Sequence, residues 1–247
     1  MDRLFDITKS TGIKIIEDAA HAVGAHVNGE HVGKYSDFAI YSFHPTKNLT
    51  TGEGGMLTIK EEKLADIARI LRFHGVEKHA WKRFGPDVKK FEYEVVNPGY
   101  KYNMMDIQAA IGIHQLNRLD EFIEKRKNLA NTYRESLASE ELLTPLGGVS
   151  YAVRHAWHLY IVLLDTDKAG ISRGEFMRRL GEYGIGTGLH YTAIHTHEYY
   201  RNKYKLEAKS CPNSLFCGER VLSLPLFPGM TAADQERVLT AVKEILA

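Results

Sequence analysis

Hydrophobic and polar residues follow two periods along the chain, one typical of helices and one of short strands. Residues 61–73 predict an amphipathic helix, since apolar residues recur there at i, i+3, i+4 and i+7. Short apolar runs predict strands at 14–17, 37–43 and 55–59. Short strands that alternate with helices indicate an α/β layered fold.

The second half of the chain repeats this alternation after a long helical stretch at 106–137. Strands are predicted at 156–164, 186–191 and 221–224, and helices at 174–183, 212–220 and 232–246. Pro145, Gly147 and Gly148 interrupt the pattern between the two halves. We therefore expect domains at 1–138 and 153–247, joined by a linker at 139–152.

Residues 74–97 fit neither period. This stretch is polar, basic and aromatic, and it predicts a long loop or hairpin. Loops of this length in compact domains are usually functional or cover an interface. We expect this one to be an interface or substrate-lid loop.

Composition and charge narrow the class of protein. Of 247 residues, 44% are hydrophobic and 26% charged, as in globular proteins, which excludes a disordered tail or a disulfide scaffold. Lys and Arg number 32 against 31 Asp and Glu, so a net charge of +1 favours neither nucleic acid nor anionic lipid. No apolar run reaches membrane-span length. With two cysteines, Cys211 and Cys217, we expect a cytoplasmic protein.

Candidate chemistry gathers after the first two predicted strands. Asp18 ends one strand, and Lys47 follows the next one in a turn rich in hydroxyl groups and glycines. Ligands of open α/β sheets bind at the carboxyl ends of strands, so both side chains are expected in one crevice. A lysine in a partly desolvated crevice can attack a carbonyl, and a carboxylate can hold a ring nitrogen protonated. These are the groups that pyridoxal phosphate (PLP) requires.

Spacing alone leaves a second interpretation of these two residues open. Asp18 is also suited to a helix N-cap, and Lys47 to a solvated position in a loop. Neither role requires a cofactor.

Four ordered motifs extend the picture over essentially the whole chain: EDAAHAVGA, SDFAIYSFHPTKNLTTGEGG, PGYKYNMMDIQAAIGIHQL and SLPLFPGMT. Together they resemble the DegT/DnrJ/EryC1/StrS family of PLP sugar aminotransferases. The resemblance implies an aspartate aminotransferase-like fold (PLP fold type I). It implies a partial large domain with a mixed sheet and a small C-terminal α/β domain. Within the family the chain is most similar to enzymes of the UDP-4-amino-4-deoxy-L-arabinose and pseudaminic-acid pathways.

The resemblance assigns roles to four residues of the first half. Lys47 matches the Schiff-base lysine, and Asp18 matches the carboxylate that pairs with the pyridinium nitrogen. His21 falls where members have Gln or His, beside the cofactor ring. Ser42 matches a hydroxyl donor to the cofactor phosphate.

A fifth cofactor residue departs from the family pattern. The family's GYN motif reads Gly99-Tyr100-Lys101 here, so Lys101 replaces the Asn that reaches the phosphate in the partner subunit's site. A lysine can still contact phosphate as a point charge. Tyr102 and Asn103 are alternatives for this role. The resemblance thus implies a homodimer with shared active sites.

Three histidines in the second half, His190, His195 and His197, raise the question of a zinc site. No acidic or thiol ligand keeps a metal-like spacing with them, so no metal is predicted. The family carries a similar segment beside its sugar substrate, which makes His190 and Tyr191 the substrate candidates. Solvated imidazoles at a strand end are the other interpretation.

The implied reaction is transamination of a nucleotide-linked 4-keto sugar, with glutamate as the amino donor, for a cell-surface polysaccharide or related glycan. Another nucleotide sugar, dTDP- or GDP-linked, is the alternative substrate. The family's large domain normally begins well before Met1 of this sequence. We therefore expect a chain that lacks the front of that domain. The rival hypothesis is a catalytically inactive remnant that acts as a binding protein.

Overall fold

The computed structural model describes residues 2–77 and 93–247. Its contacts divide the chain into two compact units, residues 1–119 and 120–247, which are described separately. Among the described residues, no helix is long and apolar enough to cross a membrane. Both cysteines, Cys211 and Cys217, are exposed free thiols.

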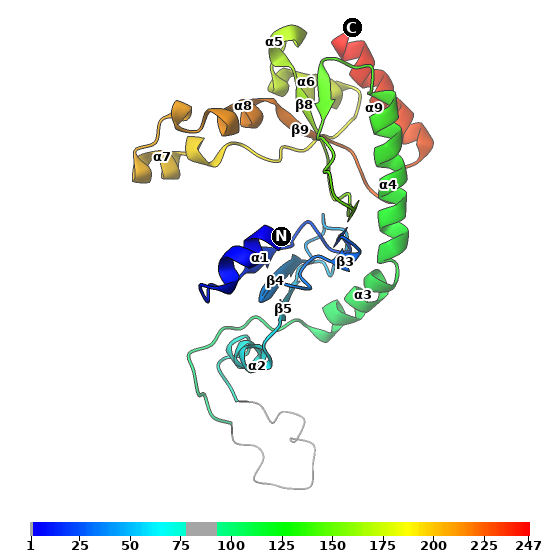
Figure 1. The fold of residues 1–247 in the computed structure, drawn as a ribbon. Coiled ribbons are helices and arrows are strands. Elements are labelled where there is room, and N and C mark those ends of the chain that lie inside the picture. The colour runs from blue at the N-terminus through cyan, green and yellow to red at the C-terminus, as the bar shows by residue number, and fades with distance from the viewer. Residues whose placement is uncertain (1, 78–92) are drawn as a thin grey trace. The chain divides into compact units, whose positions relative to one another are not determined.

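The first unit is built on a small mixed sheet (Figure 1). Its helices and strands are α1 (Asp2–Lys9), β1 (Ile16–Asp18), β2 (His26–Val27), β3 (Glu30–His31), β4 (Phe38–Ser42), β5 (Gly55–Ile59), α2 (Glu62–Leu71) and α3 (Asp106–Asn117). The sheet order is β1-β4-β5, with β1 parallel and β5 antiparallel to β4. β2 and β3 form a separate antiparallel pair. The mixed sheet predicted for the large domain is confirmed.

Gly75 and Gly99 lie against each other in the segment that follows α2. Val76 and Val95 form an antiparallel bridge, and the amide of His74 donates to the carbonyl of Tyr100 over 2.8 Å. A Cβ on Gly75 would lie 1.6 Å from the carbonyl oxygen of Asn97, so only glycine allows this approach. Of the predicted loop at 74–97, residues 78–92 lie outside the described residues.

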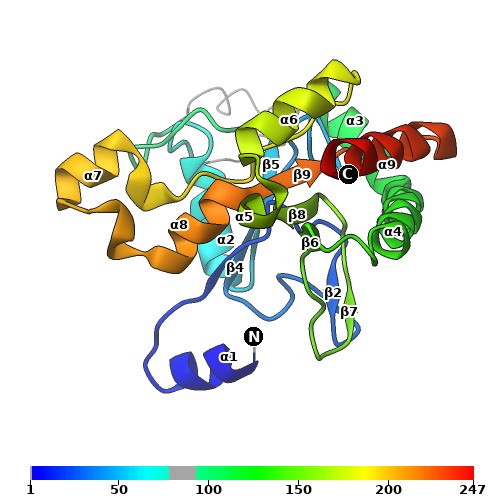
Figure 2. The same ribbon diagram turned by 90° about the horizontal axis from the view of Figure 1, so that it is seen from above.

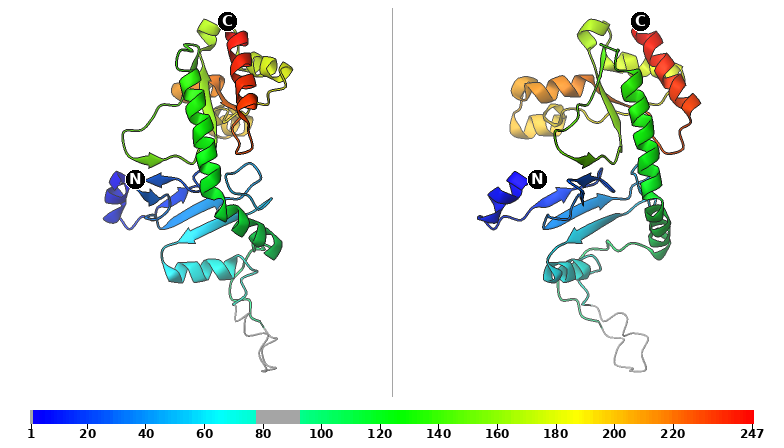
Figure 3. Two further views of the ribbon diagram at one scale, coloured as in Figure 1. Left: turned by 90° about the vertical axis from the view of Figure 1, so that its right-hand side faces the viewer. Right: turned by 45° about the vertical axis from the view of Figure 1, so that its right-hand side comes forward.

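The second unit carries the helices and strands of the second half. They are α4 (Leu119–Ser136, whose first residue belongs to the first unit), β6 (Leu143–Pro145), β7 (Val153–Arg154), β8 (Tyr160–Leu164), α5 (Thr166–Ala169), α6 (Arg173–Glu182), α7 (Glu198–Tyr204), α8 (Pro212–Arg220), β9 (Val221–Leu224) and α9 (Ala232–Leu246). β8 lies between β6 and β9, antiparallel to both. α9 runs beside α4 (Figure 3), while α7 and α8 lie on the opposite side of β8 and β9 (Figure 2).

The core of the second unit forms where α4, α6 and α9 cover the sheet. Phe176 and Leu180 of α6 and Tyr133 of α4 are fully buried in it. The amphipathic spacing of these helices explains this burial, since one face of each is apolar. Side-chain caps set where the helices begin: Ser172 accepts from the amide of Glu175 at the start of α6.

The buried Arg126 of α4 hydrogen-bonds two backbone segments, one just before β8 and one just after β9. Nη1 of Arg126 on α4 donates to the carbonyl oxygens of Trp157, His158 and Leu226 at 3.2, 3.2 and 2.7 Å. Burial lowers the pKa of Arg126 to about 10, so the guanidinium remains charged at neutral pH. The three carbonyl dipoles are what solvate this charge.

Three features differ from the sequence-based expectation. The stretch at 186–191, all of it described, forms no strand. Its β-pairing is limited to one isolated bridge, between Gly188 and Ser223. Leu143–Pro145, inside the predicted linker at 139–152, pairs with β8 as β6. The compact units divide after residue 119, before the predicted boundary at 138, because the buried face of α4 packs in the second core. The domain division of the whole protein stays a prediction.

Candidate active site

The carboxyl ends of β1 and β4 lie at one edge of the first unit's sheet. The two strands are parallel, with Asp18 opposite Ile40, so Asp18 and Ser42 end neighbouring strands at the same edge. The Asp18 carboxylate accepts a 3.0 Å hydrogen bond from the amide of Ala20. It therefore closes a turn, and no helix of the described chain begins there, which argues against the N-cap interpretation.

Lys47 stands in a tightly hydrogen-bonded turn between β4 and β5. Its amide donates to the carbonyl of His44 at 2.9 Å, and the amide of Thr51 donates to Phe43 at 3.0 Å. Leu49, two residues after Lys47, is buried. The backbone position of Lys47 is thus fixed by local bonds on both sides.

The electrostatic setting of Lys47 differs from that of a solvated lysine. Its side chain is half-buried, and this burial lowers the pKa of the ammonium group. The negative charge of Asp18 acts on it in the opposite direction and raises the pKa in part. Desolvation is the larger effect, so more of the amine is uncharged than in water. The predicted pair of amine and carboxylate therefore interacts in the folded chain.

Ser42, the predicted phosphate donor, lies half-buried at the start of this turn. Its Oγ accepts from the amide of His44 over 3.3 Å. Since Oγ acts there as the acceptor, the hydroxyl proton can still be donated to an anion.

Glycines after Lys47 permit contacts that a side chain would block. A Cβ on Gly54, whose φ is +155°, would lie 2.4 Å from Oγ1 of Thr51. A Cβ on Gly55 would lie 2.8 Å from the carbonyl oxygen of Tyr41. Glycine at these positions lets β5 return directly beside β4.

Helix α3 supports this turn through residues that the sequence did not single out. The side chain of Gln108 donates to the carbonyl of Glu53 at 2.7 Å and accepts from the amide of Met105 at 3.1 Å. Gly112 lies so close to Thr51 that a Cβ there would be 3.0 Å from Cγ2. Small and amide side chains inside an apolar motif were the signal that could have revealed this contact.

Two further predicted cofactor residues lie at the surface of the first unit. His21 is exposed in the turn after β1. Lys101 is exposed and pairs with Phe73 in an antiparallel bridge, with its Nζ 4.4 Å from the centre of the Phe73 ring. Oδ1 of Asn103, the alternative to Lys101, is buried with no hydrogen-bond partner in the described chain. The cofactor roles of His21 and Lys101 stay predictions.

His190, a predicted substrate residue, lies in the second unit against β9. Its Nδ1 lies 2.9 Å from Oγ of the buried Ser223. Gly188 and Ser223 exchange backbone hydrogen bonds of 3.0 and 2.8 Å. Tyr191 is exposed beside the imidazole. Ser223 belongs to the SLPLFPGMT motif, but neither spacing nor chemistry distinguished it in the sequence.

The other two histidines of this segment have separate settings. His195 is buried, with Nε2 2.7 Å from the carbonyl oxygen of Ala208. His197 is exposed at the residue before α7. Within residues 2–77 and 93–247, no group of three or more His, Cys, Asp or Glu side chains is arranged to hold a metal.

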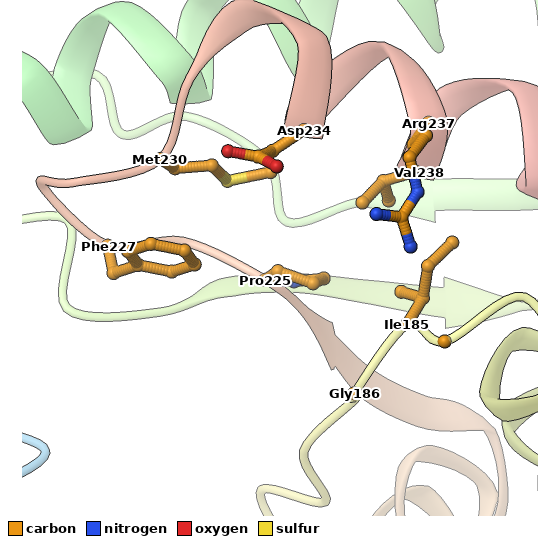
Figure 4. A pocket seen from close by; sticks show the side chains of 9 residues that line it. Ile185, Gly186, Pro225, Phe227, Met230, Asp234, Arg237 and Val238 are labelled. Atoms are coloured by element: carbon orange, nitrogen blue, oxygen red, sulfur yellow. The ribbon is translucent and has the colours of Figure 1, made fainter.

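A pocket of about 400 Å³ opens beside α9 in the second unit. Figure 4 shows Asp234 and Arg237 reaching from this helix toward Phe227, Pro225 and Ile185. Both charged groups already serve the fold: Asp234 accepts from Thr231, and Arg237 donates to the carbonyl of Tyr183. No predicted site residue is among those described as lining it.

The chain is similar to known proteins in both sequence and structure. Residues 1–243 match the model of the DegT/DnrJ/EryC1/StrS aminotransferase family. Over 248 aligned residues the chain is 42% identical to spore coat polysaccharide biosynthesis protein SpsC of Bacillus subtilis and 41% identical to the uncharacterized protein MJ1066 of Methanocaldococcus jannaschii. Both alignments cover 100% of this chain but 63% and 64% of those proteins. The chain thus spans slightly less than two thirds of the length of these curated relatives.

Solved structures agree with the fold. The putative sugar aminotransferase Spr1654 of Streptococcus pneumoniae in its PMP form superposes with a TM-score of 0.85 at 28% identity, covering 97% of this chain and 61% of that one. Its PLP form gives a TM-score of 0.83 at 28% identity, covering 97% and 59%. The predicted aspartate aminotransferase-like fold, with a partial large domain and a small α/β domain, is confirmed.

Proposed function

Because the chain belongs to the DegT/DnrJ/EryC1/StrS aminotransferase family, we propose that its protein transfers an amino group to a nucleotide-linked 4-keto sugar. The amino donor is an amino acid, glutamate in this proposal, and the cofactor is PLP. The observation that carries the proposal is the half-buried amine of Lys47, which has a lowered pKa and acts electrostatically with Asp18. The name of the relative SpsC, spore coat polysaccharide biosynthesis protein, supports a product destined for a cell-surface glycan.

The donor set fits PLP in its chemistry. An aldehyde reacts with an uncharged amine, and burial of Lys47 favours that form. Asp18 offers a carboxylate for a cationic ring nitrogen, and Ser42 offers a hydroxyl for a phosphate oxygen. When bound, PLP supplies an electron sink for negative charge at the carbon that loses a proton.

The chain's own residues then have distinct tasks. Lys47 would hold the cofactor through Nζ; once the amino group of the donor has displaced it, the freed Nζ amine would act as general base and move the α-proton from the donor's α-carbon to the cofactor. Asp18 keeps the proton on the ring nitrogen. His21 borders the ring, and Lys101 serves the phosphate of the partner subunit's site. His190 and Tyr191 contact the sugar.

A homodimer with shared sites accounts for the surface of α3. This helix is rich in apolar residues, yet none of its residues 106–117, all described, is buried. Its exposed apolar side chains include Ile107, Ile111 and Ile113. An apolar surface of this kind marks an interaction site. We place the dimer in the cytoplasm, in keeping with two free thiols.

Covalent trapping tests the proposal directly. The purified chain is mixed with PLP, reduced with borohydride, digested and analysed by mass spectrometry. We expect the pyridoxyl phosphate label on Lys47, its loss in Lys47→Arg, and an unchanged label in the matched control Lys60→Arg. Labelling at other lysines only would refute the site, and no label at all would favour the non-catalytic binding protein.

Substrate class is tested by turnover. UDP-, dTDP- and GDP-linked 4-keto sugars are incubated with glutamate and PLP, and amino-sugar formation is read by mass spectrometry. We expect amination of the UDP-linked sugar with glutamate as the preferred donor. Turnover of dTDP- or GDP-sugars alone would change the nucleotide assignment.

A further inference from the structure

Gly188 and Ser223 both lie against the imidazole of His190, and we call these two residues the His190 seat. Ser223 Oγ lies 2.9 Å from Nδ1, a hydrogen-bond distance at which the tautomer decides which atom donates. Neither Gly188 nor Ser223 has a role in the function proposed above. The seat therefore needs an explanation of its own.

The serine half of the seat is rigid. Ser223 is 4% exposed and lies in β9, all four residues of which are buried. It is paired with Ile161 of β8 on one side and with Gly188 on the other. A hydroxyl fixed on both sides by backbone pairing presents Oγ in one place.

The glycine half of the seat makes room for the ring. A Cβ on Gly188 would lie 2.6 Å from Cε1 and 3.1 Å from Nδ1 of His190. Any side chain at this position would displace the imidazole. Gly188 thus leaves room for the ring, and the Ser223 hydroxyl bonds it. The two residues come from different segments of the chain.

The bond to Ser223 fixes the direction of the ring. Oγ bonds Nδ1, and because a hydroxyl can donate or accept, this bond is compatible with either neutral tautomer. Functional histidines are commonly held in one direction by a hydrogen bond from a neighbouring residue. An imidazole held in this way presents its Nε2 edge to a sugar oxygen or hydroxyl in one place.

We propose that Ser223 is a positioning residue that fixes the orientation of His190 for binding a hydroxyl or keto oxygen of the sugar, with Gly188 providing the space. This inference rests on the function proposed above. Ser223 itself does not touch the sugar; it acts through the imidazole.

The seat is tested first without substrate or cofactor. Nitrogen-15 chemical shifts of the His190 imidazole are measured in the 247-residue chain and in Ser223→Ala, Gly188→Ala and the conservative Ser223→Thr. We expect the Nδ1 signal of a hydrogen-bonded nitrogen in the wild type, a shift of that signal in S223A and G188A, and recovery in S223T. Ser36→Ala, which removes another buried hydroxyl, serves as the control and leaves the signals unchanged.

The positioning role is tested by kinetics with a nucleotide-linked keto sugar. We expect S223A and G188A to raise KM about tenfold, which corresponds to about 1.4 kcal/mol of binding, with kcat within about twofold of the wild type. S223T and S36A should keep the wild-type KM. A merely structural role would instead lower the amount of active enzyme and leave KM unchanged.

The two readouts separate the inference from the function on which it rests. Unchanged imidazole signals and KM in both S223A and G188A, with normal wild-type turnover, overturn the seat and leave the function intact. Changed imidazole signals with unchanged KM overturn the positioning role. A wild type that labels at no lysine and aminates no keto sugar overturns the proposed function, and with it the sugar-positioning role, while the imidazole signals still report whether the seat exists.

Discussion

The side-chain amide of Gln108 donates a 2.7 Å hydrogen bond to the carbonyl oxygen of Glu53, so helix α3 holds the turn that carries Lys47. This bond joins residues from two of the sequence motifs. The Lys47 turn is thus tied to a residue 55 positions away from Glu53 in the chain.

Gln108→Ala should loosen the Lys47 turn. The substitution removes two hydrogen bonds, to Glu53 and from Met105, at about 1 kcal/mol of unfolding free energy each. The less ordered turn should slow PLP trapping at Lys47. Urea denaturation and timed borohydride reduction measure the two effects. Gln115→Ala in the same helix is the control. Trapping at the wild-type rate in Gln108→Ala would show that the turn holds itself without α3.

Asp18→Asn should lower the pKa of Lys47 further. The substitution removes the negative charge that raises this pKa and leaves the burial that lowers it. The pH midpoint of Lys47 acetylation, followed by mass spectrometry without cofactor, should therefore move to lower pH. Lys60 in the same samples reports any general change in reactivity. A midpoint that moves to higher pH would contradict the interaction between the two groups.

Arg126→Met should strongly destabilise the second unit. It leaves three carbonyl oxygens, on Trp157, His158 and Leu226, without their donor in the core. We expect the unfolding free energy to fall by about 3 kcal/mol, measured by urea denaturation. Arg154→Ala breaks an exposed ion pair with Asp120 and should cost about 0–1 kcal/mol. Equal effects of the two variants would refute the role of the buried bonds.

Glu175→Gln should remove an acid-sensitive contribution to stability. Hydrogen bonds from Arg178 and Arg179 lower the pKa of Glu175 from 4.5 to about 2. Because the folded pKa is the lower one, the stabilisation is present above pH 4.5 and is lost as the pH falls toward about 2.

The measurement is the difference in Tm between wild type and Glu175→Gln. We expect a small difference at about pH 6 that disappears near pH 2, small because the pair lies at the surface. Glu141→Gln, at another exposed acid, is the control. A difference that grows on acidification would contradict the assigned direction of the pKa.

Local sequence patterns predicted the helices and strands whose limits are marked by residues within or next to the element itself. The strand at 55–59 and the helices at 212–220 and 232–246 have the predicted bounds. Local signals mark both helix starts, since Pro212 begins one helix and the Thr231 cap precedes the other. The stretch at 186–191 does not form a strand, since its neighbour offers it pairing at Gly188 alone. The sequence did not predict β6, because Pro and Gly in this segment favour a loop. Pairing with β8 outweighs that local preference.

The sequence predicted those residues of the candidate site whose side-chain type alone indicates a chemical role. Asp18 and Lys47 stand out because a carboxylate and an amine follow neighbouring strands. Gln108 and Ser223 do not, because each acts through a contact with a residue distant in sequence. Such contacts depend on packing that no local pattern encodes.

Gly75 and Gly99 meet at the base of the segment that leaves α2, and a Cβ on Gly99 would lie 2.0 Å from the amide nitrogen of Gly75. The amides of Glu77 and Val96 donate to Glu94 and Gly75, so the backbone on either side is joined by its own bonds. The two sides of the join therefore meet backbone to backbone, and alanine at either glycine would force them apart.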